Sequence, residues 1–157
     1  MTAEHPIPDQ LIAEMTAKAR AAARVLALAT DATKAAALKA AAAALRQESQ
    51  GIIAANALDM EAGAKAGLSV AMLDRLKLDE GRLAAVADAI DQVAVLDDPV
   101  GDVIDSRTQP NGLVMRRVRI PIGVLGIIYE SRPNVTADAA ALGLRAPLHG
   151  ERVGVDG

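Results

Sequence analysis

The part of the sequence best suited to chemistry is IPIGVLGIIYESRPNVT, residues 120–136, where an apolar run ends in polar residues. Arg132 carries a planar double donor that suits a phosphate or a carboxylate. Asn134 supplies an amide that can donate to an oxyanion. An Ala-rich segment follows, and the free N–H groups at the start of a helix there would attract anions. The same residues also fit a structural interpretation, in which Asn134 only caps that helix and Arg132 pairs with Glu130. Both interpretations stay open, and the pattern does not name the anion.

A second basic cluster precedes this stretch, at Arg116, Arg117 and Arg119. It could contact a phosphate, although a solvated or interface face of a strand is the favoured interpretation. The two histidines, His5 and His149, are too far apart in the sequence to suggest a metal pair. The chain has no HExxH motif, no phosphate loop and no GxGxxG fingerprint. We therefore expect no metal site.

The composition limits both the core and the available chemistry. The chain has 157 residues, about one ordinary domain, and 52% of them are hydrophobic. It has no Phe, no Trp and one Tyr, so the core must be built from Ala, Leu, Val and Ile, and small side chains bury less apolar area each. The net charge of −3 does not favour nucleic acid as a partner. The absence of Cys excludes disulfides, thiolate metal sites and a thiol nucleophile in this sequence.

The sequence shows no signal for secretion or for membrane insertion. Its first residues, MTAEHPIPDQ, are acidic and broken by Pro, without a basic flank that leads into an apolar stretch. No run of about 18 uncharged apolar residues occurs, so a transmembrane span is not expected. We expect a cytoplasmic protein without nucleic-acid or membrane partners.

Two long helical stretches are predicted first. Residues 9–29 have apolar positions near helical spacing, with Asp9 as a possible N-cap. Residues 31–67 are dense in Ala, Leu, Lys, Gln and Glu, the best helix formers. We expect one helical stretch there, weakened in the middle by Gly51.

Two further helices follow, each with a capping residue at its start. Residues 68–78 predict a short helix that begins at Ser69 or Asp74. Asp79 then caps residues 79–96, whose apolar positions form a clear amphipathic stripe.

The periodicity changes from helix to strand after Gly101. Residues 102–108 and 113–120 are short and rich in β-branched side chains, and Asn111-Gly112 between them is a tight-turn signal. A β-hairpin is the simplest interpretation.

A strand, a loop and a helix are predicted next. The uncharged apolar run at residues 123–129 is typical of a parallel strand that is covered on both faces. Residues 135–145 predict a helix, with Asn134 or Thr136 as its N-cap. The carboxyl end of such a strand is where α/β folds bind ligands.

These residues resemble a known family. The stretch RIPIGVLGIIYESRPNVTADAAAL is similar to the signature of gamma-glutamyl phosphate reductase, also called glutamate-5-semialdehyde dehydrogenase, of the aldehyde dehydrogenase superfamily. ANALDM, LDRLKL, LDDPVG and PNGL also fall where the N-terminal region of that family would place them. The resemblance extends from about Ile7 to Arg145. It implies an α/β fold, with long helices and a β-hairpin followed by the first strand and helix of an incomplete Rossmann-like nucleotide-binding domain.

The resemblance and the patterns together divide the chain into four parts. Residues 1–100 would be the N-terminal helical part of the nucleotide-binding domain, and residues 101–121 the hairpin and interface strands. Residues 122–145 would be the first strand, loop and helix of the Rossmann-like core. Residues 146–157, APLHGERVGVDG, depart from the family pattern and form a non-family tail.

The resemblance also implies an activity. The family reduces L-glutamyl 5-phosphate with NADPH to glutamate 5-semialdehyde in proline biosynthesis, through a thioester on a cysteine. By resemblance, Tyr129, Glu130 and Ser131 would border the nicotinamide side of the cofactor. Arg132 and Asn134 would meet the acyl phosphate or its developing oxyanion. Because the sequence has no Cys, we predict no catalytic residue in it and no reductase activity of this chain alone.

Two further expectations concern association. Without neighbouring strands, residues 123–129 would form an exposed apolar edge strand, which is a predicted aggregation site. The alternative function is that of a non-catalytic remnant acting as a helical or oligomerisation module, since the family it resembles oligomerises through β-strand extensions. A homo-oligomer is therefore allowed.

Overall fold

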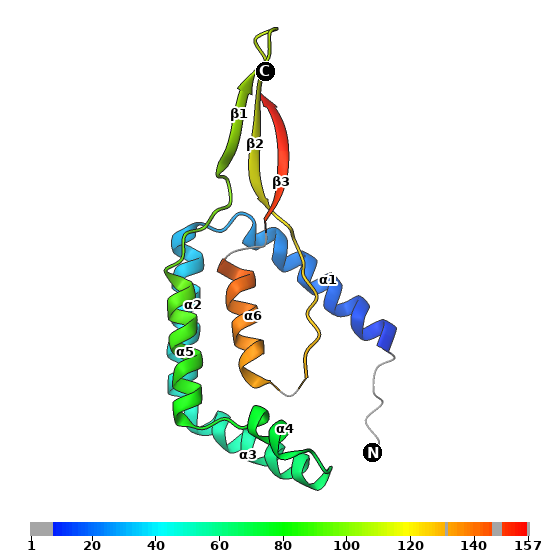
Figure 1. Ribbon diagram of the computed structural model, residues 1–157, viewed down its shortest axis with the longest axis vertical. Helices are drawn as coiled ribbons and strands as arrows, with labels where there is room; N and C mark the ends of the chain where they lie inside the picture. Colours follow the sequence, from blue (N-terminus) through cyan, green and yellow to red (C-terminus); the bar gives the residue numbers. More distant parts are fainter. Residues whose placement is uncertain (1–7, 131, 146–148, 157) are drawn as a thin grey trace. The chain divides into compact units, whose positions relative to one another are not determined.

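The computed structural model describes residues 8–130, 132–145 and 149–156 (Figure 1). Within these ranges the chain forms helices and strands in the order α1 (Pro8–Leu26), α2 (Asp31–Gln47), α3 (Ser49–Lys65), α4 (Val70–Leu76), α5 (Glu80–Ala94), β1 (Val103–Thr108), β2 (Val114–Pro121), α6 (Pro133–Arg145) and β3 (His149–Asp156).

The chain separates into two compact units. One comprises Asp31–Asp98 and Ile127–Ala146 and holds helices α2 to α6. The other comprises Met1–Thr30, Pro99–Gly126 and Pro147–Gly157 and holds α1 and the three strands. The α/β fold class that the sequence predicts is confirmed.

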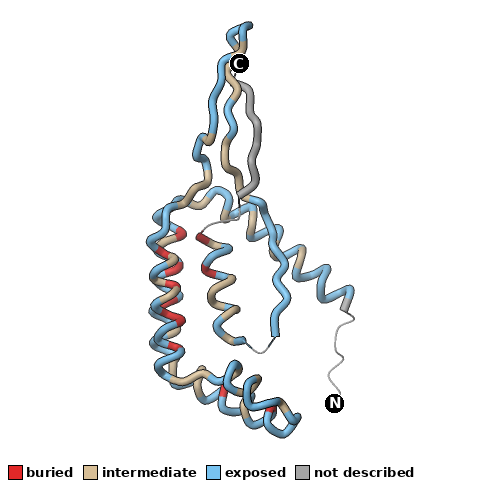
Figure 2. The backbone as a smooth tube through the Cα atoms, viewed as in Figure 1, coloured by how far each residue is buried: buried red, intermediate tan, exposed pale blue. Residues whose placement is uncertain are grey.

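The core of the helical unit lies between α2, α5 and α6, where Figure 2 shows the buried residues on facing sides. It consists only of small and branched apolar side chains: Leu38, Ala42, Val86, Ala87, Ile90, Ala94 and Ala141. This is the core that a chain without Phe or Trp must build. An apolar cavity of about 630 Å³ is lined mainly by residues of these three helices.

Two buried cations link the ends of these helices through ion pairs and hydrogen bonds. Lys34, 3% exposed, pairs with Asp98 at 2.6 Å. Arg145, also 3% exposed, donates from Nε to the Leu96 carbonyl at 2.7 Å, and from Nη1 to the Asp31 carbonyl at 3.1 Å. Arg145 Nη1 also lies 2.7 Å from the Asp31 carboxylate. The start of α2, the end of α5 and the end of α6 are therefore held together by charge-assisted bonds.

The predicted continuous helix over residues 31–67 is wrong at one point, because the chain forms two helices that are separated at Glu48. The Glu48 backbone has φ −91° and ψ 11°, outside the helical region. The two parts have different packing partners, since α2 packs on α5 and α3 on α4. Ser49 and Gly51 follow the break, and both lower the helix propensity there.

The predicted helix starts are confirmed at two places and wrong at two others. Helix α1 begins at Pro8, so Asp9 lies inside its first turn and is not the N-cap. Ser69 Oγ accepts from Met72 N at 3.3 Å at the start of α4, and Asp79 Oδ1 accepts from Arg82 N at 2.9 Å at the start of α5. Helix α6 begins at Pro133, whose fixed φ and missing N–H suit the first helical position. Asn134 and Thr136 therefore lie inside its first turn and neither is the N-cap.

The second unit contains a three-stranded antiparallel sheet in the order β1-β2-β3. The predicted hairpin is confirmed, with Thr108 opposite Val114. Gly112 has φ +86° in the turn, a conformation that glycine adopts without steric cost. The third strand was not expected from the sequence: His149–Asp156 pairs along all of β2. Backbone hydrogen bonding to a free strand edge has little sequence signature, so such a pairing is hard to foresee.

The predicted strand at residues 123–129 is absent from the described chain, and this part of the fold expectation is wrong. Residues 122–130 have no regular structure, and their apolar side chains are exposed, with Ile128 fully so. A strand is stable only when a neighbour completes its ladder of backbone hydrogen bonds. No strand in the described chain lies beside this segment, so it stays unpaired.

Candidate anion-binding site

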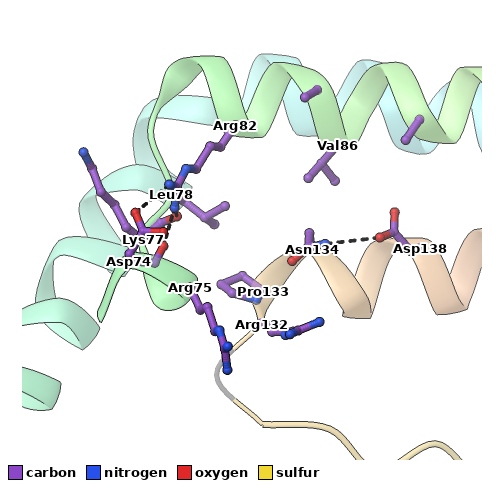
Figure 3. Close-up of a pocket in the computed structure, with 12 residues that line it drawn as sticks. Asp74, Arg75, Lys77, Leu78, Arg82, Val86, Arg132, Pro133, Asn134 and Asp138 are labelled. Atoms are coloured by element: carbon purple, nitrogen blue, oxygen red, sulfur yellow. Dashed lines mark hydrogen bonds and ion pairs between the residues drawn. The ribbon is translucent and has the colours of Figure 1, made fainter. Parts of the chain in front are cut away.

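The start of α6 places both predicted site residues on one cavity. Arg132 and Asn134 line a hollow of about 470 Å³ in the helical unit, shown in Figure 3. Its other walls come from the end of α4, the connection to α5 and the first turns of α5. The remaining lining residues are Asp74, Arg75, Lys77, Leu78, Arg82, Ala85, Val86, Ala89, Pro133 and Asp138.

A buried amide fixes the backbone between α4 and α5. Asn56 of α3 is 5% exposed. Its Nδ2 donates to the Leu76 carbonyl at 2.9 Å, and its Oδ1 accepts from Leu78 N at 2.7 Å. Because both of its polar atoms are satisfied by the same turn, Asn56 sets the path of the wall that carries Arg75 and Lys77.

Arg82 binds the acidic side of this wall. Its Nη2 donates to Asp74 Oδ1 at 2.7 Å, and its Nη1 donates to the carbonyls of Lys77, at 3.0 Å, and of Asp74. Figure 3 shows these groups gathered at the α4–α5 connection. Asp74 is therefore already neutralised by an arginine from the next helix.

The neighbouring carboxylate, Asp79, is also in use. It accepts the N-cap bond from Arg82 N, and its Oδ2 lies 3.7 Å from Lys77 Nζ. The backbone hydrogen bond from Arg82, and next the positive charge of Lys77, lower the pKa of Asp79 below its ordinary value. Asp79 stays ionised and serves the helix start.

Two guanidinium groups on the cavity have no such partner. Arg75 and Arg132 make no side-chain hydrogen bond and no ion pair with any residue that the structure describes. The pairing of Arg132 with Glu130 that the sequence allowed is therefore not observed. Asn134 Nδ2 donates to Asp138 Oδ2 at 3.3 Å, a long bond that leaves the amide weakly held.

The charges on the cavity favour an anion. Four cationic side chains and two carboxylates line it, a net charge of +2, whereas the whole chain carries −3. The sequence analysis found Arg132 and Asn134 through the local motif. It missed Arg75, Lys77 and Arg82, although LDRLKL, in which two of them stand, is a visibly basic segment.

Of the three residues predicted to border a cofactor, the structure describes Tyr129 and Glu130, and neither of these two lines the cavity. The Tyr129 hydroxyl forms a hydrogen bond with Thr136 Oγ1 in the first turn of α6, and the Tyr129 side chain is 44% exposed. Glu130 is exposed. The prediction for Ser131 lies outside the described residues.

Two other kinds of feature, a metal site and a membrane-spanning helix, are absent from the described ranges. No group of three or more His, Asp or Glu side chains is placed to hold a metal ion among residues 8–130, 132–145 and 149–156. Among the helices of these same ranges, none is both long and apolar enough to cross a membrane.

Comparison of the sequence with known proteins gives one family. The chain is 70% identical over 136 residues to a gamma-glutamyl phosphate reductase of Sphingopyxis alaskensis, a match that covers 87% of this chain and 32% of that protein. It is 60% identical to the reductase of Novosphingobium aromaticivorans, with the same coverage. No protein-family model matches the chain.

Solved structures agree with the sequence relatives. The gamma-glutamyl phosphate reductase of Thermotoga maritima superimposes with a TM-score of 0.82 at 42% identity, over 85% of this chain and 32% of that one. The enzyme of Saccharomyces cerevisiae gives 0.80 at 33% identity, over 91% of this chain and 36% of that one. The resemblance drawn from the residues is confirmed, and the chain spans about a third of the length of the curated relatives that it matches.

Proposed function

We propose that this chain, which corresponds to about a third of a gamma-glutamyl phosphate reductase, supplies the anion-binding side of that enzyme's active site. The observation that carries the proposal is the guanidinium of Arg132, which has no partner among the described residues and lies with Asn134 on a cavity of net positive charge at the start of α6. The whole enzyme would reduce L-glutamyl 5-phosphate to glutamate 5-semialdehyde and release phosphate, a step in proline biosynthesis.

Each of the two residues has a role that follows from its chemistry. Arg132 would donate two parallel N–H bonds to phosphate oxygens and so bind the substrate by its charged end. Asn134 would donate from its amide to the carbonyl oxygen, where negative charge develops during attack. Its 3.3 Å bond to Asp138 is weak enough to be exchanged for the stronger bond to an oxyanion.

The cofactor part of the proposal rests on Tyr129, Glu130 and Ser131. The hydrogen bond between the Tyr129 hydroxyl and Thr136 ties the aromatic ring to the start of α6, and the half-exposed ring offers a face to a nicotinamide. When bound, NADPH would supply the hydride for the reduction. In the same proposal, residues 122–145 act as the first strand, loop and helix of the nucleotide-binding core once neighbouring strands cover the exposed segment.

The nucleophile cannot come from this sequence, since it contains no Cys. Thioester chemistry would need a thiolate from outside these 157 residues. The purified chain is therefore expected to show no NADPH-dependent turnover of L-glutamyl 5-phosphate by itself.

A chimera tests the proposal in a complete enzyme. The 136 aligned residues of the Sphingopyxis alaskensis reductase are replaced by those of this chain, and reduction of L-glutamyl 5-phosphate is followed by NADPH absorbance. We expect the chimera to be active and Arg132→Ala to lower kcat/KM about 100-fold, the loss typical of one charge-assisted phosphate contact. Arg107→Ala, at an exposed arginine of β1, is the control and should leave kcat/KM unchanged. Equal kcat/KM for the chimera and its Arg132→Ala form would reject the role of this residue.

The second candidate function is association without catalysis, and one observation favours it. Helix α1 exposes Leu11, Ile12 and Met15, at 44%, 60% and 57%, a row of apolar side chains near helical spacing. The expected result is self-association of the chain in sedimentation equilibrium, reduced by Ile12→Glu. A monomer at every concentration would remove this candidate.

A further inference from the structure

We propose that Arg75 is the second guanidinium of a phosphate-binding pair with Arg132, so that the cavity takes a doubly charged tetrahedral oxyanion in preference to a carboxylate. The inference rests on the proposed function in assigning Arg132 to the phosphate, and it adds a residue from a different helix.

The position of Arg75 supports this pairing. It lies in the last turn of α4 and lines the same cavity as Arg132, which precedes α6. Figure 3 shows the two side chains beside the segment that leads into Pro133, whereas Arg82 lies with Asp74 at the α4–α5 connection. The two cations that lack a partner in the described part of the chain are therefore set apart from the cations that have one.

The neighbouring carboxylates explain why Arg75 stays free. Asp74 is bonded to Arg82, and Asp79 to the start of α5 and Lys77. Glu80 accepts from Gln50 Nε2 at 3.0 Å. Each acidic side chain near Arg75 in the sequence thus has another partner, so the exposed Arg75 is open to an anionic ligand in the described chain.

The number and shape of the free donors select the kind of anion. A carboxylate has two oxygens, which a single guanidinium satisfies in a planar fork. A phosphate dianion has more oxygens and twice the charge, so it can accept a fork from each of two arginines. The net charge of +2 on the cavity matches this dianion better than it matches a monoanion.

The wall that carries Arg75 is held in place before any ligand binds. Asn56 fixes the Leu76 carbonyl and Leu78 N on one side of the turn, and Arg82 fixes the carbonyls of Asp74 and Lys77. The backbone that presents Arg75 is therefore bonded on both sides of this residue. Such preorganisation lowers the cost of ordering on binding.

Titration of the 157-residue chain with inorganic phosphate at mildly alkaline pH, measured by calorimetry, tests the inference. We expect Arg75→Ala to weaken phosphate binding about tenfold or more, the loss of one charge-assisted fork. Arg75→Lys keeps the charge without the fork and should bind with intermediate affinity. Acetate should bind at least about tenfold more weakly than phosphate, and Arg75→Ala should affect it less.

The matched control is Arg46→Ala in the same helical unit. Arg46 is 43% exposed and bonds to Asp88 at 2.7 Å and Asp91 at 2.8 Å, so its removal should not change the phosphate affinity. Circular dichroism of each variant confirms that the helices persist.

Three results would overturn the inference: no phosphate binding by the folded chain, equal binding of acetate and phosphate, or an unchanged affinity in Arg75→Ala. If Arg132→Ala alone weakens phosphate binding, the inference fails and the proposed function stands. If neither Arg75→Ala nor Arg132→Ala changes phosphate affinity while the chimera still needs Arg132 for activity, the arginine pair is rejected and the proposed function stands. If that dependence is also absent, both proposals fail.

Discussion

The arginines of strand β2 and those of the helical cavity differ in whether they have a partner in the described chain. Strand β2 has three arginines within four positions, and its register places Arg117 opposite Asp105. Arg116 and Arg117 both have interaction partners, and Arg119 Nη1 lies 3.6 Å from Asp102 Oδ2. The cavity takes its cations from several separate segments, and two of them, Arg75 and Arg132, have no partner in the described chain.

The difference follows from how each structure uses its carboxylates. In an antiparallel hairpin, a residue on one strand faces a residue on its neighbour, so acidic and basic side chains can meet across it, as Asp102 and Arg119 do. At the α4–α5 connection, the carboxylates cap a helix and bind Arg82 instead, which leaves Arg75 without a partner. Under the proposal above, the way in which nearby carboxylates are engaged is a better guide to an anion site than a dense run of arginines.

The largest expected effect is the loss of stability on replacing Arg145, an arginine whose side chain bonds to other residues of the protein. It is 3% exposed and bonds to the Leu96 carbonyl and to Asp31. We expect Arg145→Ala to lower the free energy of unfolding by about 3 kcal/mol or more, because it leaves buried carbonyls without donors. Urea unfolding measures the loss, and Arg75→Ala should change stability by less than about 0.5 kcal/mol. Similar losses of stability in both variants would show that having partners within the protein does not distinguish structural arginines from ligand-binding ones.

The next effect in size is at Asn56, which positions the free arginine without touching a ligand. Asn56→Ala should lower the free energy of unfolding by about 2 kcal/mol, because the Leu76 carbonyl and Leu78 N both lose a partner. Phosphate affinity should also fall, since the wall that presents Arg75 becomes looser. Gln50→Ala, which removes an exposed amide bonded to Glu80, is the control and should cost less than about 0.5 kcal/mol. An Asn56→Ala chain with normal phosphate affinity would show that this turn does not position Arg75.

Local signals in the sequence predicted those parts of the fold that depend on neighbouring residues. The side chains of Ser69 and Asp79 cap the helices that they were expected to start, and Asn111-Gly112 forms the expected hairpin turn. Each of these features needs only the backbone a few residues away. The break at Glu48 depends on which helix packs against α2 and which against α3, so the helix-forming composition of residues 31–67 did not indicate it.

For the strands and the site too, the features that depend on distant parts of the chain could not be predicted from the local sequence. The apolar run at residues 123–129 has a strand's composition but no neighbour in the described chain, whereas His149–Asp156 pairs with β2 although no strand was expected there. Arg132 and Asn134 were found because one motif contains both. Arg75 was missed because its role depends on Arg82 taking Asp74 and on α4 lying beside the start of α6, and both are properties of the folded chain.

The smallest expected effect on stability and on phosphate affinity is at Arg119 of strand β2, which serves as a direct comparison with the arginines of the cavity. Arg119→Ala removes an ion pair between partly exposed groups, 3.6 Å apart, that contributes less than about 1 kcal/mol. It also removes Nε, a buried donor without a partner in the described chain, whose burial opposes folding. The two changes partly cancel, so urea unfolding should give nearly the wild-type stability. Calorimetry should give an unchanged phosphate affinity. If phosphate binding instead falls as far as in Arg132→Ala, strand β2 also binds the anion, and the presence of an internal partner does not tell which arginines are free for a ligand.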